Sequence, residues 1–227
     1  MPDAADAADA TDAADATDAA AIAPVPRAPG YPAELERDVV TRTGQVVHVR
    51  PIRPADAPRL VAFHSALSPA SVYLRFFSYH PVLTAREVER FTQVDYVERL
   101  ALVVESAGRL VAIGRYDRLA GTDEAEVAFI VDDDYQQQGI GTLLADDLAR
   151  AARRQGVSEF VADTLAENSG MLEMFRRVGF PMTTSFQDGV VKVRLSIEPG
   201  PAYAELLSAR EAARRVPAGP DVGDAGC

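Results

Sequence analysis

A strand, a glycine-containing turn and an amphipathic helix follow one another between residues 124 and 154, and this succession constrains the fold most strongly. The segment EAEVAFIVD (124–132) is rich in the β-branched and aromatic residues that favour strands. YQQQGIG (135–141) then introduces two glycines. The helix that follows carries one apolar face, made of Ile140, Leu143, Leu144, Leu148 and Ala151.

The segments before this unit predict short helices and two hairpins. The hairpins turn at Thr43–Gly44 and at Ala107–Gly108. One helix is expected to begin near Asp56. The next begins after a Ser68 cap with Pro69 in its first turn, and a third after the capping box of Thr84 and Glu87.

The segments after it predict two more helices and the rest of the sheet. EFVADTLA (159–166) predicts a strand, and NSGMLEMFRRVGF (168–180) predicts a helix with Asn168 near its cap and Gly179 at its end. A hairpin at Asp188–Gly189 and a peripheral helix within 202–216 follow. This order favours one mixed α/β domain over a regular βαβ repeat.

Composition and charge exclude several classes of function. The net charge of −11 gives no basic patch for nucleic acid, and no run of about 18 apolar residues predicts a membrane span. Residues 1–30 are expected to form a disordered acidic tail rich in Asp and Ala. Cys227 is the only cysteine, so the chain cannot form a disulfide framework. No secretory signal is visible either, so we expect a cytoplasmic protein. The oligomeric state is left open.

The three histidines, His48, His64 and His80, lack the spacing of metal ligands, so no metal is expected. No GxSxG elbow is present, and covalent catalysis therefore has no candidate nucleophile.

The two glycines let the backbone approach a ligand at a helix N-terminus, where unpaired N–H groups favour an anion such as pyrophosphate. A phosphate-loop NTPase would need a lysine after the second glycine, and the chain has none there. A dinucleotide-binding turn would need a third glycine, which is also missing. The remaining alternative to a ligand site is a plain strand–turn–helix.

Two motifs together resemble the GNAT superfamily of acyl-CoA-dependent N-acetyltransferases. Q-x-x-G-x-G (Gln136 to Gly141) resembles its pyrophosphate loop, and NSGMLEMFRRVGF resembles its second signature. The resemblance implies a mixed, mostly antiparallel central sheet of about six to seven strands flanked by helices. The resemblance extends over roughly residues 38–198. Over these residues the chain resembles bacterial Pat-type protein lysine acetyltransferases. Residues 199–227 are then expected to form a C-terminal helix and a frayed tail.

The resemblance also implies the site. Glu126, in AEVAF, is expected to act as the general base of an acetyl-CoA-dependent reaction. Backbone amides around Phe129, Ile130 and Val131 are expected to bind the pantetheine arm, and Asn168 to bond it as well. The pyrophosphate is expected to lie against the loop and first helical residues Gln136, Gln137, Gln138, Gly139, Ile140, Gly141 and Thr142.

Strand alternation places Glu126 on one face with Ala128 and Ile130, and partial burial among these groups would raise its pKa and make it a better base. Glu124 shares that face and is the second candidate. Many relatives have a tyrosine where this chain has Phe175, which cannot donate a proton, so no general acid is assigned.

These expectations lead to a protein N-ε-lysine acetyltransferase whose substrate is an AMP-forming acetyl-CoA synthetase. Two alternatives stay open: a small-molecule amine acetyltransferase, and a non-catalytic acyl-CoA-binding module that regulates a partner. The target lysine and the acyl-chain preference do not follow from the sequence.

Overall fold

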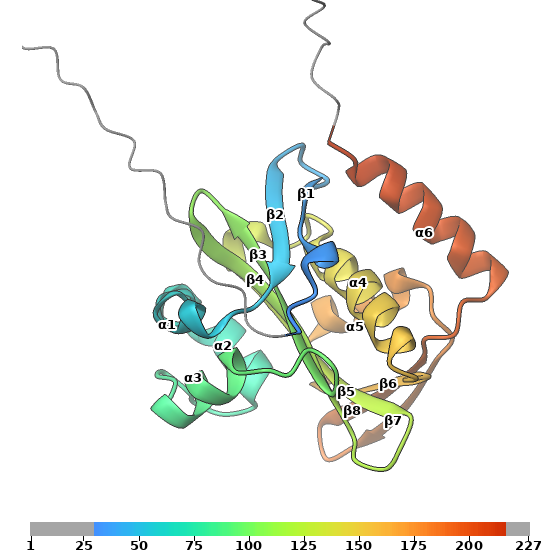
Figure 1. The fold of residues 1–227 in the computed structure, drawn as a ribbon. Coiled ribbons are helices and arrows are strands. Elements are labelled where there is room, and N and C mark those ends of the chain that lie inside the picture. Colours follow the sequence, from blue (N-terminus) through green and yellow to red (C-terminus); the bar gives the residue numbers. More distant parts are fainter. Residues whose placement is uncertain (1–29, 217–227) are drawn as a thin grey trace, which may run out of the picture.

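The computed structural model describes residues 30–216, so the expected acidic tail and the last eleven residues lie outside the described part. The described chain forms one open sheet of eight strands in the order β1-β2-β3-β4-β5-β6-β8-β7, flanked by helices (Figure 1). All neighbouring strands are antiparallel except β5 and β6. The mixed α/β class is confirmed, but the sheet has eight strands and not the six to seven that the resemblance implied, because all three expected hairpins pair and join β5 and β6 in one sheet.

The strands are β1 (Arg37–Val40), β2 (Val46–Pro51), β3 (Arg99–Ser106), β4 (Arg109–Arg118), β5 (Glu124–Val131), β6 (Glu159–Leu165), β7 (Met182–Gln187) and β8 (Val190–Ser196). The α-helices are α1 (Ala57–Ala66), α2 (Pro69–Phe76), α3 (Ala85–Thr92), α4 (Ile140–Arg154), α5 (Ser169–Val178) and α6 (Pro201–Arg214). Three short 3-10 helices are η1 (Ala33–Leu35), η2 (Pro54–Asp56) and η3 (Asp133–Tyr135). No helix within residues 30–216 is long and apolar enough to cross a membrane.

Local signals in the sequence account for several of these boundaries. The Ser68 hydroxyl accepts a hydrogen bond from the Ser71 N–H at 3.1 Å, which caps α2 as expected. Thr84 and Glu87 form the expected capping box of α3. The β3–β4 hairpin turns through two residues with positive φ, Ala107 and Gly108, as a tight two-residue turn requires.

Two apolar cores lie on opposite faces of the sheet. Because strand residues alternate between faces, Leu100, Leu102 and Val104 of β3 enter the core beneath α4, and Ala101 and Val103 enter the core beneath α1–α3. Figure 1 shows α1, α2 and α3 gathered on one side of the sheet, with α4 and α5 on the other. The face that carries Glu126 and its neighbours on β5 is therefore the α1–α3 side.

A network of buried charges joins the α1–α3 layer to the sheet. Arg50 of β2 donates two hydrogen bonds to the Asp56 carboxylate, at 2.7 and 2.6 Å, and a third to Glu105 of β3 at 2.7 Å. The side chains of Arg50 and Asp56 are both 5 % exposed. Burial opposes ionisation of Asp56, but the Arg50 guanidinium outweighs it and lowers the pKa of that carboxyl.

Helix α4 is held from two sides by adjacent buried aspartates. Asp147 accepts two hydrogen bonds from Arg37 of β1, at 2.7 and 2.6 Å. Asp146 accepts from Arg210 at 3.0 Å and from Arg214 at 2.9 Å, both on α6. Burial raises the pKa of Asp146 and of Asp147 despite these cations. The C-terminal helix is mostly exposed, and these ion pairs join it to α4.

Candidate active site

A cavity of about 1320 Å³ opens where β5 separates from β6, and its walls come from β5, the loop before α4, α2, α5 and α6. Its volume exceeds the roughly 300–1,000 Å³ of a typical small-molecule site, which leaves room for two ligands side by side. All twelve residues expected from the sequence line it: Glu126, Phe129, Ile130, Val131, Gln136, Gln137, Gln138, Gly139, Ile140, Gly141, Thr142 and Asn168.

The separation of β5 from β6 leaves one edge of β5 open to the cavity. The two strands pair in parallel only from Glu124↔Glu159 to Glu126↔Val161. Beyond that point β5 continues to pair with β4 as far as Val131, and its other edge borders the cavity. Residues 162–164 of β6 line the opposite wall. An extended ligand can therefore lie along β5 in place of a strand.

The loop before α4 is held in an unusual backbone conformation. Gln137 has φ of 60° and Gly139 has φ of 85°, both in the left-handed region. A Cβ at Gly139 would lie 3.1 Å from the Arg42 side chain. Two contacts brace the loop: the Gln138 carbonyl accepts from the Arg42 N–H at 3.0 Å, and its side chain accepts from the Thr43 hydroxyl at 2.9 Å.

The N-terminus of α4 is suited to an anion. Gly139 supplies no side-chain cap, and the first turn of the helix carries no acidic residue. The helix dipole and the first-turn N–H groups are therefore uncompensated within the described chain. Gly141 brings α4 close to α5, because a Cβ there would lie 3.1 Å from Met174 Cγ. Arg42, Arg176 and Arg177 add positive charge to the cavity wall. This wall fits a pyrophosphate.

Glu126 is exposed within the cavity, so the expectation of partial burial was wrong. Its side chain projects on the α1–α3 side at the last residue pair before the strands separate. The second candidate, Glu124, does not line the cavity and instead forms an ion pair with Arg194 of β8. The geometry therefore favours Glu126 over Glu124 as a proton acceptor.

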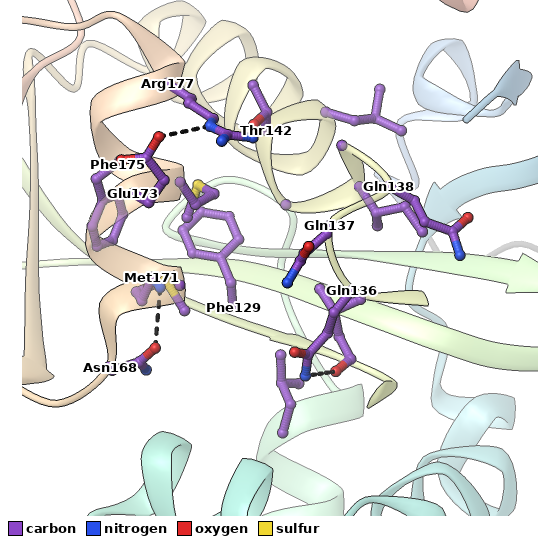
Figure 2. A pocket seen from close by; sticks show the side chains of 18 of the residues that line it. Phe129, Gln136, Gln137, Gln138, Thr142, Asn168, Met171, Glu173, Phe175 and Arg177 are labelled. Atoms are coloured by element: carbon purple, nitrogen blue, oxygen red, sulfur yellow. Dashed lines mark hydrogen bonds and ion pairs between the residues drawn. The ribbon is translucent and has the colours of Figure 1, made fainter. Parts of the chain in front are cut away.

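Asn168 immediately precedes α5 and Phe175 lies on it, both opposite the loop glutamines (Figure 2). The Asn168 side-chain oxygen accepts a hydrogen bond from the Met171 N–H at 3.0 Å, so it caps α5. Phe175 is 1 % exposed and contacts the Phe129 ring edge to face, with 6.1 Å between ring centroids. Phe175 thus supports the cavity wall through packing.

Several cavity residues were missed from the sequence. Arg75 on α2 lines the cavity near Glu126, and Arg42 reaches it from the β1–β2 turn. Residues of α6, among them Leu206 and Arg210, form a further wall. Arg176 and Arg177 stand inside the second signature motif, which could have drawn attention to them. The other residues carry no local signal, because only tertiary packing brings them to the cavity.

The histidines have partners other than metal. His48 Nδ1 lies 2.7 Å from Asp38, and His80 stacks on Phe76 with 4.3 Å between centroids. Within residues 30–216 no group of three or more His, Cys, Asp or Glu side chains is placed to hold a metal ion.

Comparison with known proteins identifies the fold and motifs. Residues 70–180 match the Acetyltransferase (GNAT) family. The GNAT domain of S. lividans PAT is 41% identical and superposes with a TM-score of 0.70, covering 73% of this chain and 99% of that one. The chain belongs to the GNAT acetyltransferase family. "Acetyltransferase PA5475" of Pseudomonas aeruginosa is 30% identical over 141 residues, which are 60% of this chain and 76% of that protein.

Another GNAT relative is similar over a longer stretch. "Acetyltransferase Pat" of Mycolicibacterium smegmatis is 32% identical over 185 residues, which are 78% of this chain. The chain spans 55% of the length of that protein. The likeness relates this GNAT chain to Pat-type enzymes over the part that the two share.

Proposed function

We propose that the chain is an acetyl-CoA-dependent protein N-ε-lysine acetyltransferase, with Glu126 as general base and an AMP-forming acetyl-CoA synthetase as substrate. The observation that carries the proposal is the position of Glu126, exposed in the cavity at the point where β5 leaves β6. The Pat-type likeness supports a protein substrate. The twelve clustered residues support acetyl-CoA as the co-substrate.

The chain's own residues have distinct tasks in this proposal. The amides and glycines from Gln136 to Thr142 hold the pyrophosphate, where the uncapped end of α4 favours negative charge. The β5 edge from Phe129 to Val131 holds the pantetheine arm, together with Asn168. When bound, acetyl-CoA supplies the acetyl thioester. Alternation along the β4–β5 ladder directs the Ile130 N–H to β4, whereas the N–H groups of Phe129 and Val131 face the free edge of β5. We assign to one of these two edge N–H groups the hydrogen bond to the thioester oxygen, where negative charge develops during transfer.

Glu126 addresses the protonation of the acceptor. A free lysine has a pKa near 10.4, so only about one amine in 2,500 is neutral at pH 7, a handicap of roughly 4.6 kcal/mol. Glu126 removes this proton, directly or through water that reaches it in the open cavity. No described side chain is assigned the return of a proton to the thiolate, since Phe175 has none to give.

The test is transfer of labelled acetyl from acetyl-CoA to purified acetyl-CoA synthetase. We expect label on a lysine with the wild type, and a fall in kcat of at least about a hundredfold with Glu126→Gln. Acetyl-CoA binding, measured by calorimetry, should be retained by that variant. Glu124→Gln is the matched control and should change kcat by less than about threefold, because Glu124 lies outside the cavity.

Other outcomes support the alternatives. Undiminished transfer by Glu126→Gln would remove Glu126 from the role of base. Transfer to small amines but to no protein would favour a small-molecule acetyltransferase. Tight binding of acetyl-CoA without transfer to any acceptor would favour a non-catalytic regulatory module. We also propose a cytoplasmic location, which follows from the proposed substrate.

A further inference from the structure

Arg75 is a partly buried cation without a hydrogen-bond or ion-pair partner among residues 30–216. It lies near the C-terminal end of α2, and its side chain lines the large cavity. Within residues 30–216 its guanidinium makes no hydrogen bond and no ion pair; its recorded contact is with the face of the Phe76 ring, 5.2 Å from Cζ to the centroid. A guanidinium has five N–H donors, and partly buried arginines ordinarily satisfy them.

The neighbouring arginines on the same side of the sheet differ from Arg75 in this respect. Arg115 donates to the Asp117 carboxylate at 2.9 and 2.8 Å. Arg99 donates to the same carboxylate at 2.9 Å. Arg90 lies 3.9 Å from it as well, so Asp117, the acidic group that could also pair with Arg75, is already engaged by three cations.

The surroundings of Arg75 make its charge unfavourable. Burial, together with the repulsion of Arg115, lowers the pKa of Arg75 to about 10, although Glu126 and Asp117 oppose the change. A group that costs stability in the free protein is often retained for a function, because the missing partner arrives with a ligand.

Arg75 and Glu126 line the same cavity from different walls, one on α2 and the other on β5. The Glu126 carboxylate, like the Arg75 guanidinium, has no hydrogen bond or ion pair with another described residue. A cavity that presents an unpaired carboxylate and an unpaired guanidinium is complementary to a ligand with a cation and an anion of its own. The planar fork of arginine suits a carboxylate especially well.

We propose that Arg75 determines acceptor specificity by binding a carboxylate that the acceptor carries beside its reacting amine. The inference rests on the proposed acetyl transfer. In a protein substrate that carboxylate is an aspartate or glutamate next to the modified lysine, so the preferred site is a lysine with an acidic neighbour. The amine lies toward Glu126 and the anionic group toward Arg75.

The experiment compares matched acceptors that differ only in this carboxylate. One pair is a lysine peptide with Asp or Asn after the lysine; the other is Nα-acetyl-lysine and its amide, which share the same ε-amine. Both pairs are tested with wild type, Arg75→Met, Arg75→Lys and the control Arg86→Met. Arg86 is an exposed cation on α3 outside the cavity, so its loss tests net charge alone.

We expect the wild type to favour the acidic acceptor by about tenfold or more in kcat/KM, a difference of about 1.4 kcal/mol. Arg75→Met should bring this ratio close to one, through a larger fall in kcat/KM for the acidic acceptor than for the neutral one. Arg75→Lys should keep part of the preference, and Arg86→Met all of it. Arg75→Met should also raise Tm, whereas replacing a purely structural arginine would lower it.

The outcomes separate this inference from the proposed function. Peptide acetylation with equal rates for Asp and Asn, or a preference that survives in Arg75→Met, overturns the inference and leaves lysine acetylation standing. Modification of Nα-acetyl-lysine alone, with a preference lost in Arg75→Met, supports the inference and overturns the protein substrate. Absence of transfer to every acceptor overturns both.

Discussion

Replacing Arg50 by methionine should destabilise the protein strongly, because Arg50 compensates two carboxylates between the α1–α3 layer and the sheet. The substitution keeps the length and most of the volume of the side chain. It removes the two bonds to Asp56, the bond to Glu105 and a fourth to the Pro51 carbonyl at 3.0 Å. The loss therefore acts on charge and hydrogen bonding more than on packing.

The loss in free energy of unfolding depends on the hydrogen bonds that Asp56 and Glu105 keep in the variant. Removing one partner of a buried ion pair costs about 3–5 kcal/mol, since the other charge stays desolvated. Asp56 keeps the Arg53 N–H at 2.8 Å and a long contact with Arg59 at 3.4 Å, and Glu105 keeps Arg59 at 2.7 Å. These contacts place the expected loss near the lower end, at about 3 kcal/mol. For a chain of this size the corresponding fall in Tm is roughly 6–12 °C.

The loss should also depend on pH with a definite sign. In the wild type the folded-state pKa of Asp56 lies below its ordinary value of 3.8. Its stabilising contribution is therefore complete above that value and is lost as the pH falls through the lower folded-state pKa. In Arg50→Met the carboxyl is buried without its main cation, so protonation relieves the penalty. The gap between wild type and variant should narrow as the pH falls from 7 toward 4 and below.

Urea unfolding at several pH values measures this gap, read as a change in midpoint at constant m. Arg154→Met is the matched control, because Arg154 pairs with Glu34 at 3.7 Å and both side chains are more than half exposed. That variant should change the free energy of unfolding by less than about 1 kcal/mol at every pH. A loss below about 1 kcal/mol in Arg50→Met, or a loss that does not change with pH, would refute the reasoning.

Two further predictions concern the cavity wall. Gly139→Ala should cost about 1 kcal/mol through its positive φ and raise KM for acetyl-CoA at least about fivefold, because the new methyl group meets Arg42. Gly156→Ala has similar strain but open space around it, so an equal rise in KM there would contradict a ligand role for the loop. Arg210→Met breaks the link from α6 to α4 and to the Val178 carbonyl at 3.0 Å, and should raise KM for acetyl-CoA severalfold with kcat nearly unchanged. An unchanged KM by steady-state kinetics would show that α6 does not shape the cofactor end.

Much of the fold could be predicted because its signals are local. The caps at Ser68 and Thr84 and the turn at Ala107–Gly108 depend on residues within a few positions of one another. The loop from Gln136 to Gly141 likewise carries its chemistry in consecutive residues. Residues expected to share a cavity on the strength of two motifs do share it.

The exposure or burial of individual charged side chains depended on how helices and strands pack against one another. The exposure of Glu126 could not be derived from strand alternation, because alternation fixes the face of the sheet and not whether a helix covers it. On a helical wheel Asp147 lies within the apolar face of α4 and Asp146 lies outside it, yet both are 1 % exposed because β1 and α6 bring arginines to them.

The sequence by itself determined the strand–turn–helix unit and the glycine loop, since these follow from short-range sterics and hydrogen bonding. Only the tertiary structure decided that β5 parts from β6 after Glu126, that α6 closes one wall, and that Arg75 reaches the cavity without a hydrogen-bond or ion-pair partner among residues 30–216. The physical reason is that the balance of charge and burial at a site depends on neighbours from distant parts of the chain, which no local pattern encodes.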